Sequence, residues 1–211
     1  MELKGEITAL QTANLKFSIS GKLVSVNCKI GDTVKKGQLL AALDKTEFQA
    51  YLDRALKQYD LERALFDEKQ KQNLTEYEKR KYQDSLDISI KNVEIAKADL
   101  DKTDLNSSIE GIVIEMDPVN PGDNITPADF VINVANPESF CFLAELPEEN
   151  LSQIGIGQPA KVTLKAFPDK ILEGKVEQIG FSPIREGLFP VTISIPFDPI
   201  LRLGLSGTAS L

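Results

Sequence analysis

The sequence contains no histidine and no tryptophan, and only two cysteines and two methionines in 211 residues. Without histidine, Ser-His and Cys-His catalysis is excluded, and the commonest transition-metal ligand is missing. Two methionines are too few for a thioether copper site. Two cysteines, Cys28 and Cys141, are too few for a disulfide framework, so both are expected to be small buried residues. We therefore predict that the protein is not an enzyme and has no catalytic, cofactor-binding or metal-binding residue.

Long apolar runs and an excess of basic residues are also missing. No stretch approaches about eighteen consecutive apolar residues, the length at which a transmembrane helix is predicted. The net charge of −8 argues against the clustered basic face of a nucleic-acid-binding protein, so no nucleic acid is expected as a partner. The first residues, Met1 to Lys4, are typical of a strand and do not resemble a signal peptide. The chain is therefore either cytosolic or part of a longer exported protein.

Glycine and proline are absent from residues 45–105, although the flanks hold thirteen glycines and eleven prolines. Because these residues are the strongest breakers, their absence marks a change of architecture. Apolar residues within the segment recur at steps of three and four, as in the seam of a coiled coil. The first row is Phe48, Leu52, Ala55, Tyr59 and Phe66, with Glu62 interrupting it, and the second is Tyr82, Leu86, Val93, Ala96 and Leu100, with Ser89 in the row. The polar residues 69–76 separate the rows, and there Asn73 with Glu76 is predicted to cap a new helix. The pattern predicts two antiparallel helices of about 28 residues, each about 42 Å long.

The outer surface of these helices leaves two alternatives open. Ile88, Ile90 and Ile95 lie partly off the seam, so they either widen the stripe that covers the other arm or form a lateral surface for another protomer. The run Glu78–Lys81 is interpreted as a solvated helix face, with a docking patch as the alternative. Acid-before-base pairs at i,i+4 are predicted to support the helices; these are Asp53–Lys57, Asp67–Lys71, Glu76–Arg80 and Asp87–Lys91.

The sequence on both sides of the helical segment predicts β-structure. Residues 21–44 and 111–136 resemble each other, since each has a glycine, alternating apolar residues, a Gly-Asp turn and a final apolar run. This internal repeat predicts two equivalent halves of one sandwich. Residues 2–20 are predicted to add one or two leading strands to the same domain. Beyond Asn136, a short helix after Pro147 and several short strands predict a small β-barrel or sandwich.

The order of these parts, with the stretch GKLVSVNCKIGDTVKKGQLLAALD, resembles the HlyD-like periplasmic adaptor family, or membrane fusion proteins, over essentially the whole chain. The resemblance implies an α+β multidomain fold: a lipoyl-like β-sandwich split by an antiparallel α-helical coiled-coil hairpin and followed by a small β-barrel domain. The implied domains are residues 1–44 plus 106–136, 45–105 and 137–211, with a membrane-proximal domain and a membrane anchor outside this chain. Lys45 begins a helix instead of standing on a tight turn, so no lipoyl or biotin group is expected.

The resemblance also implies a function and partners. Such adaptors bridge an inner-membrane pump, here expected to be of the resistance-nodulation-division (RND) type, and an outer-membrane channel protein, and they self-associate in a ring that is usually hexameric. The alternatives are the adaptor of an ABC-type exporter or type I secretion system, a coiled-coil scaffold, and a carrier domain. For docking at the hairpin tip the resemblance points to Thr75 as the hydroxyl residue and to Arg63, next to the expected arginine position at Ala64. Gln72, Asn73 and Leu74 are added as contact residues because they form the apex. Glu68 stands where a leucine is expected, and only Glu110 and Gly111 match the family's usual start of the second half.

Overall fold

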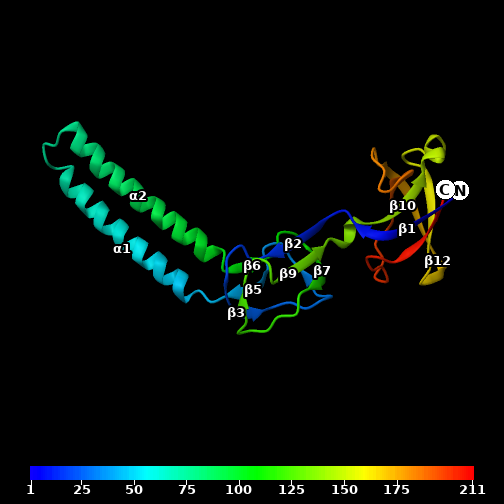
Figure 1. Cartoon of the computed structure of the whole chain (residues 1–211), viewed down its shortest axis with the longest axis horizontal. Helices are drawn as coiled ribbons and strands as arrows, with labels where there is room; N and C mark the ends of the chain where they lie inside the picture. Colours follow the sequence, from blue (N-terminus) through cyan, green and yellow to red (C-terminus); the bar gives the residue numbers. More distant parts are fainter. The chain divides into compact units, whose positions relative to one another are not determined.

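A computed structural model describes all 211 residues, which divide into two compact units (Figure 1). The sandwich–hairpin unit consists of Asn14–Ser108 and Val113–Asn133. The barrel unit consists of Met1–Ala13, Ile109–Ile112 and Val134–Leu211. Neither of the two long helices is both long and apolar enough to cross a membrane.

The sandwich is built from two four-stranded sheets of matching composition. One sheet has the order β2-β9-β7-β4 and the other β6-β5-β3-β8. The strands of the first half are β2 (Thr12–Lys16), β3 (Gly21–Val26), β4 (Thr33–Val34) and β5 (Leu39–Leu43). Those of the second half are β6 (Asp104–Asn106), β7 (Gly111–Met116), β8 (Asn124–Ile125) and β9 (Val131–Ala135). Each half contributes two strands to each sheet, so the predicted sandwich of two equivalent halves is confirmed, and the repeat extends to β2 and β6.

The two halves interlock through their Gly-Asp turns. Gly31 and Gly122 have φ of 94° and 106°, the left-handed region that glycine adopts without a steric penalty. Asp32 and Asp123 each accept a hydrogen bond of 2.8 Å from a backbone N–H three residues earlier. The N–H of Leu23 then donates to the carbonyl of Asp123 at 2.8 Å, and that of Val113 donates to the carbonyl of Asp32 at 2.9 Å. Each half therefore completes the other's sheet, and the sandwich core does not depend on the segment between them.

That intervening segment forms the hairpin of α1 (Thr46–Lys69) and α2 (Glu76–Asp101), which run side by side in opposite directions (Figure 1). The residues of both predicted rows are half-buried or buried, whereas almost all the other helix positions are exposed, so the predicted seam is confirmed. The helices have 24 and 26 residues, fewer than the predicted 28, because α1 ends at Lys69 and the cap at Thr75 begins α2 only at Glu76. The predicted i,i+4 ion pairs are not those observed. Glu76 pairs with Lys79 at 2.8 Å and Lys91 with Glu94 at 2.7 Å, because i,i+3 partners on a wet helix compete at nearly equal energy.

A polar layer interrupts the seam near its middle. Ser89 is buried and its hydroxyl donates back to the carbonyl of Leu86 at 2.7 Å. Glu62 is half-buried and accepts a hydrogen bond of 2.8 Å from the Gln58 amide. Both residues line one open groove of about 210 Å³ on the hairpin surface. Polar residues within a seam cost stability but favour one register of the two helices.

We expect Glu62→Leu to stabilise the hairpin by about 1 kcal/mol, because a leucine would bury apolar surface that the carboxylate does not. Thermal unfolding followed by circular dichroism at the helical minimum measures the change. Asp60→Leu is the matched control, because Asp60 is exposed and lies two residues before Glu62 on the same helix. This change should leave the unfolding midpoint unchanged. A lower midpoint for Glu62→Leu would show that the polar layer contributes net stability.

The barrel unit is a closed six-stranded barrel with the order β1-β10-β13-β12-β11-β14. Its strands are β1 (Glu2–Ala9), β10 (Phe140–Pro147), β11 (Pro159–Leu164), β12 (Phe167–Ile179), β13 (Leu188–Ser194) and β14 (Ser206–Ser210). Phe140, Phe142, Ala144 and Leu146 alternate into its core. Short 3-10 turns, η1 (Pro137–Ser139) and η2 (Glu148–Gln153), flank β10, and η2 follows Pro147 where a short helix was predicted.

The position of the first strand corrects the prediction that residues 2–20 join the sandwich. β1 pairs with β10 on one side, where Gly5 faces Ala144, and with β14 on the other, where Gly5 faces Gly207. Leu3 and Ile7 are buried in this barrel. Without β1, both β10 and β14 would present open edges, so the first strand closes the barrel and only β2 adds to the sandwich.

Candidate functional site at the hairpin tip

The base of the hairpin is fixed to the sandwich by short polar contacts. The N–H of Leu43 donates to the carbonyl of Thr103 at 2.9 Å, so the two chain ends entering the hairpin are paired. The ammonium of Lys45 lies 2.6 Å from the carboxylate of Asp104. Asp44 accepts hydrogen bonds from the backbone N–H and the hydroxyl of Thr46, at 2.9 and 2.7 Å, and these bonds lower the pKa of its carboxyl. Lys45 thus takes part in the joint at the helix start, and the joint sets the direction of both helices.

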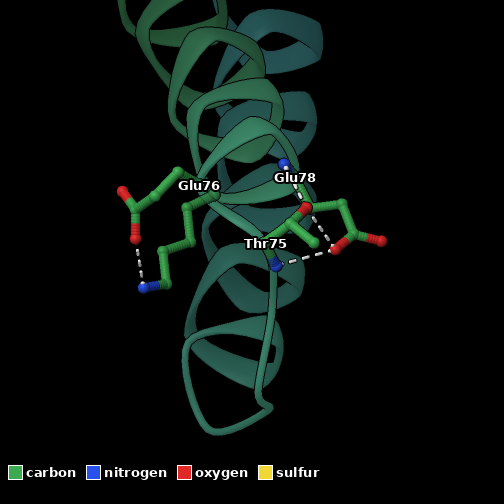
Figure 2. A network of polar contacts seen from close by, with 4 residues as sticks. Thr75, Glu76 and Glu78 are labelled. Carbon is green, nitrogen blue, oxygen red and sulfur yellow. Dashed lines mark hydrogen bonds and ion pairs between the residues drawn. The ribbon is translucent and has the colours of Figure 1, made fainter.

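The tip is ordered by a capping box at the start of α2. Thr75 has extended backbone angles and is the N-cap. Its hydroxyl accepts from the N–H of Glu78 at 3.3 Å, and the Glu78 carboxylate accepts from the Thr75 N–H at 2.9 Å and from its hydroxyl at 2.7 Å (Figure 2). The prediction that Asn73 and Glu76 form this cap is wrong by two residues, because Thr75-x-x-Glu78 supplies both reciprocal bonds whereas Asn73 stays in the loop.

The structure brings four of the five predicted contact residues together. Gln72 and Asn73 are exposed at the apex, Leu74 is half-buried beside them, and Thr75 follows as the cap. Arg63 is not part of this group. It lies on α1 six residues before Lys69, where its guanidinium donates to the Tyr59 hydroxyl at 2.9 Å and lies 5.9 Å from the centre of that ring.

An open groove of about 810 Å³ lies beside the apex. Its apolar lining comes from Phe66, Leu74, Tyr77 and Tyr82, and cations at its rim include Lys69, Lys79 and Arg80. Sequence reasoning did not select Tyr77, which is 79% exposed. The available signal was its place off the seam, five residues before Tyr82, where a large aromatic side chain has no partner arm to pack against. The arrangement offers a contact surface and no reactive group.

The Thr75 hydroxyl is committed to the cap, so its removal has a structural effect. Thr75→Ala should lower the stability of the hairpin by about 1 kcal/mol, whereas Thr75→Ser should keep the cap. The hydrogen bonds from Thr75 hold the pKa of Glu78 below its usual range. The capping box therefore stabilises the hairpin at pH values above the usual pKa of a glutamate, and this stabilisation is lost as the pH falls through the lowered pKa of Glu78. Helical unfolding at neutral and at acidic pH tests both statements, and equal midpoints for the alanine and serine variants would contradict them.

The two cysteines are buried and carry no reactive thiolate. Cys28 and Cys141 are both free and buried, as predicted. Burial raises the pKa of the Cys141 thiol to about 11, with a smaller contribution from Glu177, and it also raises the pKa of Cys28. Both side chains are therefore protonated packing residues at neutral pH.

Comparison with known proteins identifies one protein family and several relatives that are similar to this chain. Residues 11–136, more than half of the chain, match the protein family described as the CzcB-like, barrel-sandwich hybrid domain. The macrolide export protein MacA of Yersinia pestis is 23% identical over 246 residues, which covers 98% of this chain and 66% of that protein. The chain thus spans about two thirds of the length of the curated relatives that it matches.

Solved structures share the fold over the full length of the chain. The membrane fusion protein Spr0693 of Streptococcus pneumoniae R6 superposes with a TM-score of 0.81 at 24% identity, covering 100% of this chain and 97% of that chain. A MacA-MexA chimeric protein containing the Pseudomonas aeruginosa MexA α-hairpin domain superposes with a TM-score of 0.88 at 21% identity, covering 99% of this chain and 80% of that chain. The predicted fold class, a split sandwich with an inserted hairpin and a barrel, is confirmed.

Proposed function

Because the chain belongs to the CzcB-like barrel-sandwich hybrid family, we propose that it is a non-enzymatic adaptor, or membrane fusion, subunit of an efflux system. The observation that carries this proposal is the joint at the base of the hairpin. Two halves of one sandwich interlock without the helices, yet the chain inserts a paired helical hairpin between them and fixes its direction through Lys45 and Asp104. A rigid projection with an open groove at its apex is suited to reaching another component, and it supplies nothing for catalysis.

For the partners we propose an inner-membrane transporter of the RND type and an outer-membrane channel, with the protein in the periplasm and attached to the inner membrane in its complete form. The barrel unit and the proposed membrane-proximal domain would serve the transporter, and the hairpin tip would serve the channel. An ABC-type exporter is the alternative transporter. Identification of the co-purified membrane partner decides between them, since an ABC transporter carries a P-loop motif and an RND transporter does not.

Self-association into a ring, proposed as hexameric, is supported by one lateral face of the hairpin. Ile88 and Ile95 are 62% and 60% exposed, so they do not cover the other arm, whereas Ile90 is half-buried. On the same face a groove of about 470 Å³ lies between Tyr51 of α1 and Ile95 of α2. Exposed apolar residues along one face favour the alternative of a surface for another protomer.

The first test is deletion of the gene in its host, scored against a panel of dyes, detergents, bile salts, antibiotics and metals. Hypersensitivity to chemically unrelated amphiphiles, reversed by the full-length gene, is the expected result. An unchanged panel would favour a dedicated secretion system instead of multidrug efflux.

A further inference from the structure

Charge is distributed unevenly along the hairpin. The tip segment, residues 69–81, carries five cations against two carboxylates, Glu76 and Glu78; the cations are Lys69, Lys71, Lys79, Arg80 and Lys81. The rest of both helices is predominantly acidic, as is the chain with its net charge of −8.

The tip segment keeps a net charge of +3, five cations less two carboxylates, because hydrogen bonding does not neutralise Glu78. Glu78 is held by Thr75 in the capping box, and Glu76 is paired with Lys79 on the other side of the helix (Figure 2). Lys69 lies 3.7 Å from Glu68. The exposed side chains of Lys71, Arg80 and Lys81 make no ion pair. The positive charge that remains at the tip is therefore available to a partner.

One of the unpaired cations, Arg80, borders apolar surface, in a groove that Asp84 also lines. Arg80 lines the groove of about 810 Å³ together with Phe66, Leu74, Tyr77 and Tyr82. Aromatic and arginine side chains around a preformed groove are typical of residues that dominate binding energy at protein interfaces. The capping box has already ordered the tip, so little conformational entropy is lost on docking.

We propose that the hairpin tip binds an acidic segment of a partner protein, which inserts an apolar side chain into the tip groove and directs carboxylates to Lys71, Arg80 and Lys81. This inference rests on the proposed function in that it takes the tip to be the end that meets another component. Complementary charge would fix the docking register and speed association, and it would make the contact weaken with salt. The run Glu78–Lys81 then acts as a docking patch instead of the solvated face that its sequence suggested.

The test uses the full-length protein in its host, with a photo-crosslinking amino acid in place of Tyr77, whose exposure makes the change neutral for folding. Crosslinked peptides are mapped by mass spectrometry. The tip variant is Lys71→Gln/Arg80→Gln/Lys81→Gln. The matched control, Lys36→Gln/Lys57→Gln/Lys97→Gln, removes three equally exposed cations outside the tip and makes the same change in net charge.

The expected result is a crosslink to a protein segment with net negative charge, with a yield that falls about tenfold in the tip variant and stays unchanged in the control. The proposal is overturned by crosslinks to a neutral or basic segment, to lipid, or to a second copy of this chain, and equally by an unchanged yield in the tip variant. This readout does not depend on an export phenotype. A silent susceptibility panel with an acidic, tip-dependent crosslink would refute the efflux function alone, and the reverse pattern would refute the tip inference alone.

Discussion

Gly5→Ala is expected to unfold the barrel unit. Gly5 sits in β1 between Ala144 of β10 and Gly207 of β14, so its backbone is held on both sides. A Cβ at this position would lie 2.2 Å from the carbonyl oxygen of Leu143 and 2.8 Å from the Cα of Ala144. Both are backbone atoms of a paired strand and cannot rotate away. The clash can be relieved only by separating β1 from β10, which opens the barrel.

The loss should reach about 3 kcal/mol or more, the upper range for overpacking, and that is a large share of the stability of an ordinary domain. Gly155→Ala is the matched control, because a Cβ there meets nothing within 4 Å and its stability should be unchanged. Chemical unfolding followed by hydrogen–deuterium exchange of the paired strands β1 and β10 measures the effect on the barrel, while the helical circular-dichroism signal reports the hairpin separately. An unfolding midpoint for Gly5→Ala equal to that of Gly155→Ala would mean that β1 does not close the barrel.

The hairpin and the repeat could be predicted because their signals are local. The absence of glycine and proline from residues 45–105 and the seam spacing depend only on neighbours along the chain. The two Gly-Asp turns carry the same chemistry at Gly31 and Gly122. Each of these patterns specifies a backbone conformation without reference to distant residues.

The place of β1 could not be predicted for the opposite reason. Alternation of Leu3 and Ile7 says that one face of the strand is buried, but it does not say against which sheet. The pairing partners of β1 begin at Phe140 and Ser206, far along the chain, and only the closed barrel selects them. Long-range pairing of this kind leaves no mark in the spacing of nearby residues.

At the tip, too, some features could be predicted from the sequence and others could not. The apex position of Gln72 to Leu74 follows from the polar break between two helical rows, and the sequence contained the Thr75-x-x-Glu78 pattern that sets the cap. The free cations could not be foreseen, because the choice of Lys79 instead of Arg80 as the partner of Glu76 rests on a small energy difference between i,i+3 and i,i+4 pairs. Arg63 was assigned to the tip from the resemblance, and its distance along α1 sets it apart from the apex.

Removal of the whole hairpin should leave the sandwich folded and abolish export. Leu43 and Thr103 are hydrogen-bonded neighbours, so residues 45–102 can be replaced by an Asn-Gly turn of the kind that joins paired antiparallel strands. Asp104→Asn accompanies the change, because the deletion removes the Lys45 ammonium that balances the carboxylate. The reciprocal bonds of Leu23 and Val113 remain, and these join the two halves. Circular dichroism should lose the helical minimum and keep a cooperative β transition, and the host should become as susceptible as the gene deletion. Export that persists would contradict the adaptor proposal.

A shortened hairpin separates the need for reach from the need for a tip. Deleting residues 56–62 and 89–95 removes one heptad from each arm, including Glu62 and Ser89 together with Tyr59 and Val93. It brings Ala55 four positions before Phe66 on α1 and Ala96 three positions after Leu86 on α2. The seam and the capping box are kept, but the apex is lowered by about 10 Å at 1.5 Å per residue. Because the apolar layers of the remaining seam are continuous, this variant should unfold at or above the temperature of the unchanged protein. If the hairpin spans a fixed gap between components, export should fall to the level of the full deletion although the tip is intact. Normal export would show that the tip alone is required and that the length of the helices is free to vary.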